Sequence, residues 1–114
     1  MKLSIIIPIY NEQESLDSLF KELSDIFANQ SETEIIFIND GSTDQTLSIL
    51  ENKIKDYSTW KIIDLYRNYG KSVALQAGFD NALGEIIATM DADLQDNPNE
   101  IYRLIDELNK GYDV

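Results

Sequence analysis

The stretch from Ile86 to Asp93 reads Ile-Ile-Ala-Thr-Met-Asp-Ala-Asp, an apolar run that ends abruptly in two carboxylates. The run from Ile86 to Met90 predicts a buried β-strand, which puts Asp91 and Asp93 at its carboxyl end. Side chains two residues apart in an extended backbone point the same way, so both carboxylates would face one point. Carboxylate oxygens, completed by phosphate and water, suit Mg²⁺ or Mn²⁺. A strand that ends in a solvated acidic turn explains the same residues, and the short motif alone leaves both interpretations open.

Three further apolar segments precede this stretch and also predict parallel strands. They are rich in β-branched residues and span Leu3–Tyr10, Glu34–Asn39 and Lys61–Leu65. Pro8 cannot donate a hydrogen bond to a neighbouring strand, so it marks the end of the first strand or an edge of the sheet.

Helical patterns separate the strands. The apolar spacing predicts helices over Glu12–Asn29, from the turn at residues 40–44 to about Lys55, from after Gly70 to about Leu83, and from Asn97 to Gly111. Ser42 and Gln45 form a capping-box pattern at the start of the second helix, in which we expect Leu47, Leu50 and Ile54 to be buried.

The third helix carries small residues on one face, namely Ala74, Ala77 and Gly78. These residues indicate close packing of this helix on the sheet, and Gly84 is expected to end it.

This alternation predicts an α/β fold with an open, mostly parallel sheet and helices on both faces, as in Rossmann-like nucleotide-binding units. Such sheets bind ligands at the carboxyl ends of their strands, where the strand order switches. The segments at those ends are Tyr10-Asn11-Glu12, Asp40-Gly41-Ser42, Arg67 to Lys71, and Asp91-Ala92-Asp93. Three of them carry acids and the other carries two bases, which suits a nucleotide diphosphate with a metal ion.

The composition narrows the range of partners. The formal net charge of the 114 residues is −12, from 21 acidic and 9 basic residues, which argues against duplex nucleic acid and anionic membranes as partners. The chain has no cysteine for disulfides and no histidine for acid–base chemistry. Leu3–Ile9 is too short for a signal peptide, and no run approaches the roughly 20 apolar residues of a membrane span, so we expect no membrane segment in this chain. Neither G-x-G-x-x-G nor a Walker A sequence is present, so phosphate charge would be met by a metal and by Arg67 or Lys71.

Four motifs together resemble glycosyltransferase family 2. They are Pro8-Ile9-Tyr10-Asn11-Glu12, Asn39-Asp40-Gly41-Ser42-Thr43-Asp44, Arg67-Asn68-Tyr69-Gly70-Lys71 and Asp91-Ala92-Asp93-Leu94-Gln95-Asp96. The nearest likeness is to the branch of dolichol-phosphate mannose synthase and the bacterial polyprenyl-phosphate glycosyltransferases. The resemblance implies a GT-A fold with a D-x-D motif. It also implies that residues 1–114 are the nucleotide-sugar-binding part of a domain that continues beyond residue 114 with the catalytic residues of its acceptor-binding half.

The resemblance also implies roles for individual residues. Pro8, Tyr10 and Glu12 would line the nucleoside pocket with Ile38 beside it, and Asp40 would hydrogen-bond the base. Asp91 and Ala92 would contact the ribose and diphosphate region together with Lys71, and Asp93 and Gln95 would bind the metal.

Four of these residues have a simpler structural explanation. Pro8 would only end a strand, and Glu12 would only stabilise the start of a helix. Asp40 would only stabilise a turn, and Lys71 would be a solvated surface charge.

The function implied by the resemblance is inverting transfer of a sugar from a UDP- or GDP-linked donor, with Mn²⁺ or Mg²⁺, to a polyprenyl phosphate. Such an acceptor is already an anion, so little base catalysis is needed. The chain would be cytoplasmic, at the cytoplasmic face of the membrane in the full-length protein, and inactive alone. Two alternatives stay open: a receiver-like Mg²⁺-binding signalling module, and a family 2 transferase that acts on a saccharide acceptor in cell-wall or capsule synthesis.

Overall fold

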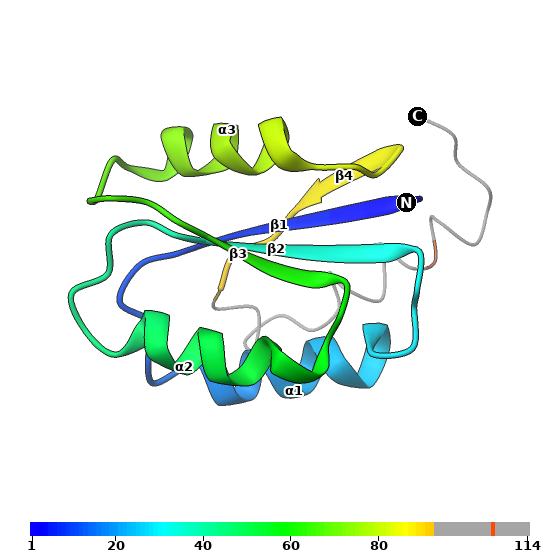
Figure 1. Cartoon of the computed structure of the whole chain (residues 1–114), viewed down its shortest axis with the longest axis horizontal. Coiled ribbons are helices and arrows are strands. Elements are labelled where there is room, and N and C mark those ends of the chain that lie inside the picture. The colour runs from blue at the N-terminus through cyan, green and yellow to red at the C-terminus, as the bar shows by residue number, and fades with distance from the viewer. Residues whose placement is uncertain (93–105, 107–114) are drawn as a thin grey trace.

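The computed structural model describes residues 1–92 and 106 and contains one four-stranded parallel sheet. The strand order is β3-β2-β1-β4, with α1 and α2 on one face of the sheet and α3 on the other (Figure 1). The elements are β1 (Leu3–Ile9), α1 (Leu16–Phe27), β2 (Thr33–Asn39), α2 (Thr46–Lys53), the 3₁₀ turn η1 (Ile54–Asp56), β3 (Trp60–Asp64), α3 (Lys71–Asn81) and β4 (Ile86–Thr89). The predicted open α/β sheet is confirmed.

The order of the strands reverses direction once. The chain proceeds outward from β1 through β2 to β3, and then α3 carries it back to β4 on the other side of β1. Right-handed crossovers in opposite directions place their helices on opposite faces, which explains the position of α3. The switch in strand order therefore lies between β1 and β4, where such sheets bind ligands.

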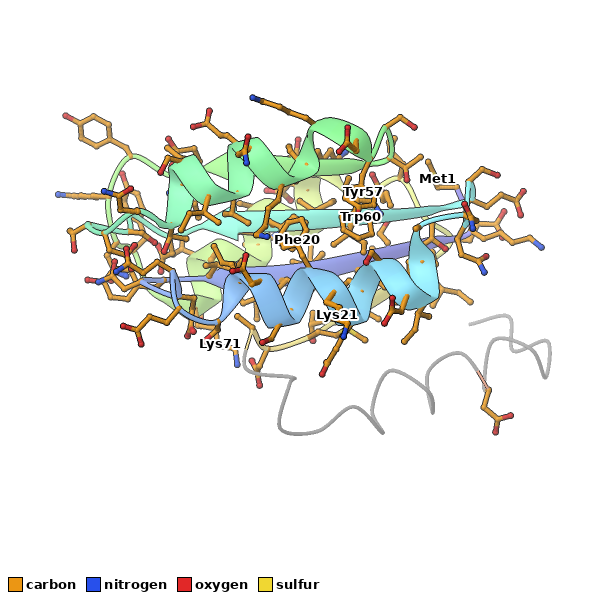
Figure 2. All side chains as sticks on the ribbon, turned by 90° about the horizontal axis from the view of Figure 1, so that it is seen from below. Met1, Phe20, Lys21, Tyr57, Trp60 and Lys71 are labelled. Carbon is orange, nitrogen blue, oxygen red and sulfur yellow. The ribbon has the colours of Figure 1, made fainter. Side chains whose placement is uncertain are left out.

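The larger core lies under α1 and α2. Alternate residues of β1 and β2 point to this face and meet a cluster of aromatic rings. The rings of Phe20 and Phe37 stack with centroids 4.9 Å apart, and Tyr57 stacks on Trp60 at 4.0 Å. Figure 2 shows Phe20, Tyr57 and Trp60 gathered together at this core. Burial of these large side chains holds the helical layer to the sheet.

The α3 face is packed more closely. Ile6, Ile36 and Ile38 are fully buried there with Ala74 of α3. A methyl group added to Gly78 would collide with the Ile6 side chain. The predicted close approach of α3 to the sheet is thus confirmed.

Several predictions about local structure were wrong. Among residues 1–92 and 106, β4 lies at the edge of the sheet, and its half-buried Ile86 and Ala88 alternate with exposed residues, so it is not a fully buried strand. The capping box at Ser42 does not form, because α2 begins at Thr46 and Gln45 makes no side-chain capping bond. In α2, Leu50 is buried as expected, whereas Leu47 and Ile54 are only partly covered.

Gly84 was expected to end α3, but the helix already stops at Asn81. Gly84 instead lets the chain approach β1, because its N–H donates to Ser4 Oγ at 2.8 Å and an added Cβ would lie 2.6 Å from Ser4 N.

Pro8 lies within β1, which is a central strand. The carbonyl of Ile6 accepts a hydrogen bond from Met90, so Pro8, two residues later, also faces the β4 side. Since pairing with β4 ends at Ile6, the missing N–H of Pro8 removes no ladder bond.

The helix expected from Asn97 and the strand start expected at residues 112–114 lie outside the described residues. Within the described part of the chain, no helix combines the length and apolar character that crossing a bilayer requires.

Candidate functional site

An open cleft of about 410 Å³ lies at the carboxyl edge of the sheet, at the switch between β1 and β4. Figure 2 places Lys71, which lines this cleft, at the opposite end of the molecule from Met1. The lining comes from all the strand-end segments expected to meet: Pro8, Ile9, Tyr10, Glu12, Asp40, Asn68, Gly70, Lys71, Asp91 and Ala92. The structure therefore brings together seven of the predicted site residues, namely Pro8, Tyr10, Glu12, Asp40, Lys71, Asp91 and Ala92.

Three predicted residues are not placed in the cleft. Ile38 is fully buried between the sheet and α3, so its side chain has no open surface for a ligand. Asp93 and Gln95, the predicted metal ligands, lie outside the described residues.

The segment after β1 enters the cleft through Tyr10, which is 45% exposed, and Glu12, which is half-buried. Thr46 Oγ1 accepts a hydrogen bond from the Glu12 N–H at 3.0 Å. The start of α2 thereby supports the main chain that carries these two side chains.

Asp40 follows β2 and is 4% exposed, which is unusual for a carboxylate. Its Oδ1 accepts the N–H of Tyr69 at 2.8 Å, and its Oδ2 accepts the N–H of Gly70 at 3.1 Å and the amide of Asn68 at 3.2 Å. The Asn68 amide also donates to the Asp40 carbonyl at 3.1 Å. Asp40 therefore holds the loop that leads into α3, a contact that the prediction of a base-binding role did not include.

Two glycines allow the loops to meet. Gly41 has a φ of 69°, and a side chain there would collide with the backbone of Arg67 and Asn68. Gly70, at the N-cap of α3, has a φ of 97°. Both angles lie in the region that L-residues other than glycine rarely adopt.

Lys71, the first residue of α3, reaches across the cleft to Asp91 after β4. Its Nζ lies 2.9 Å from Asp91 Oδ1, and each side chain is 63% exposed. An exposed pair of this kind contributes roughly 0–1 kcal/mol, so an incoming anion can displace it at little cost. Arg67 does not line the cleft, and its guanidinium lies 5.1 Å from the centroid of the Tyr69 ring.

The charges of the cleft bear on metal binding. The lining of the cleft includes three acidic residues, Glu12, Asp40 and Asp91, and the basic residue Lys71. A nucleotide diphosphate entering this acidic cleft would be stabilised by a further cation, and a divalent ion coordinated by carboxylate and phosphate oxygens fits that need. Within residues 1–92 and 106, no group of three or more acidic residues is arranged to hold a metal ion by itself.

Ile9, Asn68 and Gly70 also line the cleft, although none of them was among the predicted site residues. The available signal was their position within the strand-end segments, since Asn68 and Gly70 sit in the turn before α3. Asn11 also has a role that its position alone did not suggest, because its side chain bonds to residues more than thirty positions away.

Several curated proteins are similar to the chain. An uncharacterized glycosyltransferase of Synechocystis sp. is 44% identical over 115 residues, covering 100% of this chain and 36% of that protein. An undecaprenyl-phosphate 4-deoxy-4-formamido-L-arabinose transferase of Pseudomonas fluorescens is 43% identical over 113 residues, covering 97% of this chain and 33% of that protein. The chain thus spans about a third of the length of the curated relatives it matches.

Solved structures are also similar to the chain. The structure of residues 1–349 of S. aureus TarS in complex with UDP-GlcNAc superposes with a TM-score of 0.75 at 29% identity, covering 94% of this chain and 32% of that fragment. A mannosyltransferase from Pyrobaculum calidifontis, in complex with GDP-Man and Mn²⁺, superposes with a TM-score of 0.73 over 81% of this chain and 27% of its own. At 24% identity, the second match concerns the fold alone.

The profile of the family described as "Glycosyl transferase family 2" matches residues 4–114. This match runs through the segments after all four strands, including those that line the cleft. The chain therefore belongs to glycosyl transferase family 2.

Proposed function

We propose that the chain is the nucleotide-sugar-binding part of an inverting glycosyltransferase that uses a divalent metal and transfers a sugar to a polyprenyl phosphate. The observation that carries the proposal is the meeting of four strand-end segments in one cleft at the β1/β4 switch. The donor is a UDP- or GDP-linked sugar. Family membership leaves the receiver-like alternative without support.

Different side chains of the cleft bind different parts of the donor. Pro8, Tyr10 and Glu12 line the nucleoside pocket. Asp40 accepts a hydrogen bond from the base on the one lone pair of Oδ1 that its loop contacts leave free. Ile38 supports the site only from within the core. This division is the one that the resemblance to the family implies, and the presence of Tyr10, Glu12 and Asp40 in one cleft supports it.

The diphosphate lies toward β4. Asp91 and Ala92 face the ribose and diphosphate, and Lys71 leaves its pair with Asp91 to meet the incoming negative charge. Asp93 and Gln95 would hold the metal, which would supply Lewis-acid assistance to the departing diphosphate. Every other contribution of this chain is binding and orientation.

The acceptor proposal draws on two kinds of support. The motif resemblance points to the polyprenyl-phosphate branch, and the Pseudomonas fluorescens relative is named as an undecaprenyl-phosphate transferase. A lipid phosphate is a ready nucleophile, so the lack of histidine is no obstacle. We place the full-length protein at the cytoplasmic face of a membrane, where a nucleotide sugar and a lipid acceptor meet.

The first test is thermal unfolding of the chain with UDP or GDP, each with and without Mn²⁺. A ligand that binds only the folded state raises the stability, by about 2.7 kcal/mol at a hundred times its Kd. Stabilisation by nucleotide plus Mn²⁺, greater than by either alone, is the expected result, and no stabilisation by any combination would contradict the proposal.

The second test is sugar transfer to undecaprenyl phosphate by the chain and by its full-length protein. We expect turnover only with the full-length protein, because the 114 residues supply the donor side of the reaction. Turnover by the chain alone would contradict that division. Transfer to a saccharide but not to the lipid phosphate would contradict the acceptor.

A further inference from the structure

Asn11 lies between the cleft residues Tyr10 and Glu12 but does not itself line the cleft. Its φ is 49°, which makes it the one non-glycine residue with a positive φ among residues 1–92 and 106. Asparagine tolerates this left-handed conformation better than most L-residues, because its short side chain bonds to nearby main chain. A backbone of this kind persists only where its surroundings hold it.

The surroundings that hold Asn11 belong to the segment after β2. Asn11 Oδ1 accepts the N–H of Thr43 at 2.8 Å and the N–H of Asp44 at 3.3 Å, and Nδ2 donates to Thr43 Oγ1 at 3.3 Å. The N–H of Asn11 donates to Ser42 Oγ at 2.9 Å. One side chain therefore acts as both acceptor and donor toward a single loop, a combination that an amide provides.

The residues that follow continue the junction. The Glu12 N–H donates to Thr46 Oγ1 at 3.0 Å, and the Gln45 N–H donates to Gln13 Oε1 at 3.0 Å. Tyr10, being 45% exposed, receives limited restraint from packing. Its direction is therefore set mainly by the main chain on either side, which Asn11 controls.

We propose that Asn11 is a positioning residue for the donor site. Its left-handed backbone and its bonds to Thr43 and Asp44 fix the directions in which Tyr10 and Glu12 enter the cleft. This role rests on the proposed function for its ligand, but its structural part is independent of that function. Asn11 acts through its neighbours and touches no ligand.

Three variants separate the backbone from the side chain. Asn11→Gly keeps the left-handed backbone and removes the side-chain bonds, Asn11→Ala removes the bonds and strains the backbone, and Asn11→Asp keeps the acceptor oxygens. Calorimetry with UDP or GDP plus Mn²⁺ measures the affinity. We expect a loss of about tenfold for Asn11→Gly, a larger loss for Asn11→Ala, and recovery to within about threefold for Asn11→Asp. The matched control is Asn29→Gly, at an exposed asparagine between α1 and β2, which should change the affinity less than twofold.

A double-mutant cycle tests whether the effect passes through the neighbours. In a chain that already carries Tyr10→Ala and Glu12→Gln, Asn11→Gly should have almost no further effect on affinity, because the side chains that it positions are gone. A full tenfold additional loss would overturn the proposal, as would an Asn11→Gly variant that binds like the unmodified chain.

Failure of the proposed function is visible separately. If the unmodified chain binds neither nucleotide, that function fails, and the positioning role is then decided without ligand by amide hydrogen exchange and chemical shifts. Asn11→Gly should speed exchange at Thr43 and Asp44 by about tenfold and shift the resonances of Tyr10 and Glu12. Unchanged exchange and unchanged shifts would overturn the role of Asn11.

Discussion

Two buried carboxylates, one at each end of β2, attach the two ends of α3 to the sheet. Asp40 accepts the N–H groups of Tyr69 and Gly70 just before the helix begins. Glu34, which is 2% exposed, accepts the N–H of Leu83 just after the helix ends, at 2.6 Å. A buried carboxylate thus accepts backbone N–H groups at both the carboxyl edge and the amino edge of the sheet.

The two carboxylates differ in their other partners. Glu34 also accepts from Ser4 Oγ at 2.5 Å and pairs with Lys61 Nζ at 3.0 Å, so its charge is matched within the fold. The hydrogen-bond donors to Asp40 are uncharged, and Asp40 lines the open cleft. A paired carboxylate serves the fold, whereas a carboxylate held by neutral donors beside a cleft keeps a negative charge that a ligand can use.

The largest expected effect comes from the glycines that let each junction close. Gly41→Ala at the carboxyl edge and Gly84→Ala at the amino edge should each lower the free energy of unfolding by about 3 kcal/mol or more, because the added Cβ meets fixed backbone. Urea denaturation measures the loss. The control is Gly70→Ala, where no atom lies within 4 Å of the new Cβ, so that only the backbone strain of about 1–3 kcal/mol remains. Equal losses at Gly41 and Gly70 would show that the loop crossing is not tightly packed.

The next largest effect is expected at the predicted metal ligand Asp93, and it concerns the stabilisation by ligand rather than the stability of the fold. Asp93→Ala should remove the Mn²⁺-dependent stabilisation by nucleotide, about 2.7 kcal/mol at a hundred times the Kd, and leave the stability without ligand nearly unchanged. Thermal unfolding with UDP or GDP, with and without Mn²⁺, measures both quantities. Asp96→Ala is the matched control and should keep the ligand effect. A metal-dependent shift that survives Asp93→Ala would remove Asp93 from the metal role.

Breaking the amino-edge pair affects stability alone. Glu34→Gln replaces a buried carboxylate that holds Lys61 and should cost about 2 kcal/mol in urea denaturation. The nucleotide affinity of the folded variant should stay within twofold, because Glu34 lies at the far end of the sheet from the cleft. Glu32→Gln is the control, since Glu32 is 67% exposed and pairs with Lys2 at 3.7 Å, and it should cost less than about 0.5 kcal/mol. A large loss of affinity in Glu34→Gln would show that the two edges are coupled through α3.

The elements and the place of the cleft could be predicted from the sequence because both depend on local pattern. Alternating apolar runs predict strands, and parallel strands bring their carboxyl ends to one edge. Pro8, Tyr10, Glu12, Asp40, Lys71, Asp91 and Ala92 all line the cleft for this reason. The depth of burial of β4 was missed, since an apolar strand reads alike at the edge and at the centre of a sheet.

The detailed roles depend on contacts that no local pattern contains. Ser42 fits a capping box, yet its hydroxyl accepts the N–H of Asn11, 31 positions earlier. Glu34 looks like the polar start of a strand, but its partners lie 30 and 49 positions away. In both cases a tertiary hydrogen bond gives the residue a role that the local pattern does not indicate. For Glu34 this follows from burial, because a buried polar group needs a partner wherever the fold provides one.

A smaller effect on stability, with a larger one on binding, is expected at Asp40. Asp40→Asn keeps one acceptor but turns an amide toward the N–H groups of the loop, which should cost about 1–2 kcal/mol. Nucleotide affinity should fall at least tenfold, because the variant loses both the charge and the placement of the loop that leads into α3 at Lys71. Calorimetry and urea denaturation together distinguish this variant from Glu34→Gln. Affinity within twofold of the unmodified chain would show that Asp40, like Glu34, serves only the fold.

The smallest effect is the pH dependence of stability at the two edges. Burial raises the pKa of Glu34, but the Ser4 hydroxyl, the Leu83 N–H and Lys61 outweigh it and hold the pKa below 4.5. Burial likewise opposes ionisation of Asp44 near the cleft, but hydrogen bonds from Thr46 and Gln13 hold its pKa below 3.8.

In the unfolded chain these carboxyls bind protons at a higher pH than in the folded chain. Their stabilising contributions are therefore complete above the unfolded pKa values and are lost as the pH falls through the folded ones. Urea denaturation from pH 6 downward should show stability falling below about pH 4.5, with the fall reduced in Glu34→Gln at the higher end of this window and in Asp44→Asn at the lower end. Identical pH profiles for Glu34→Gln and the unmodified chain would show that the ionised form of Glu34 gains nothing from its partners, and the contrast between the two edges would then rest on Asp40 alone.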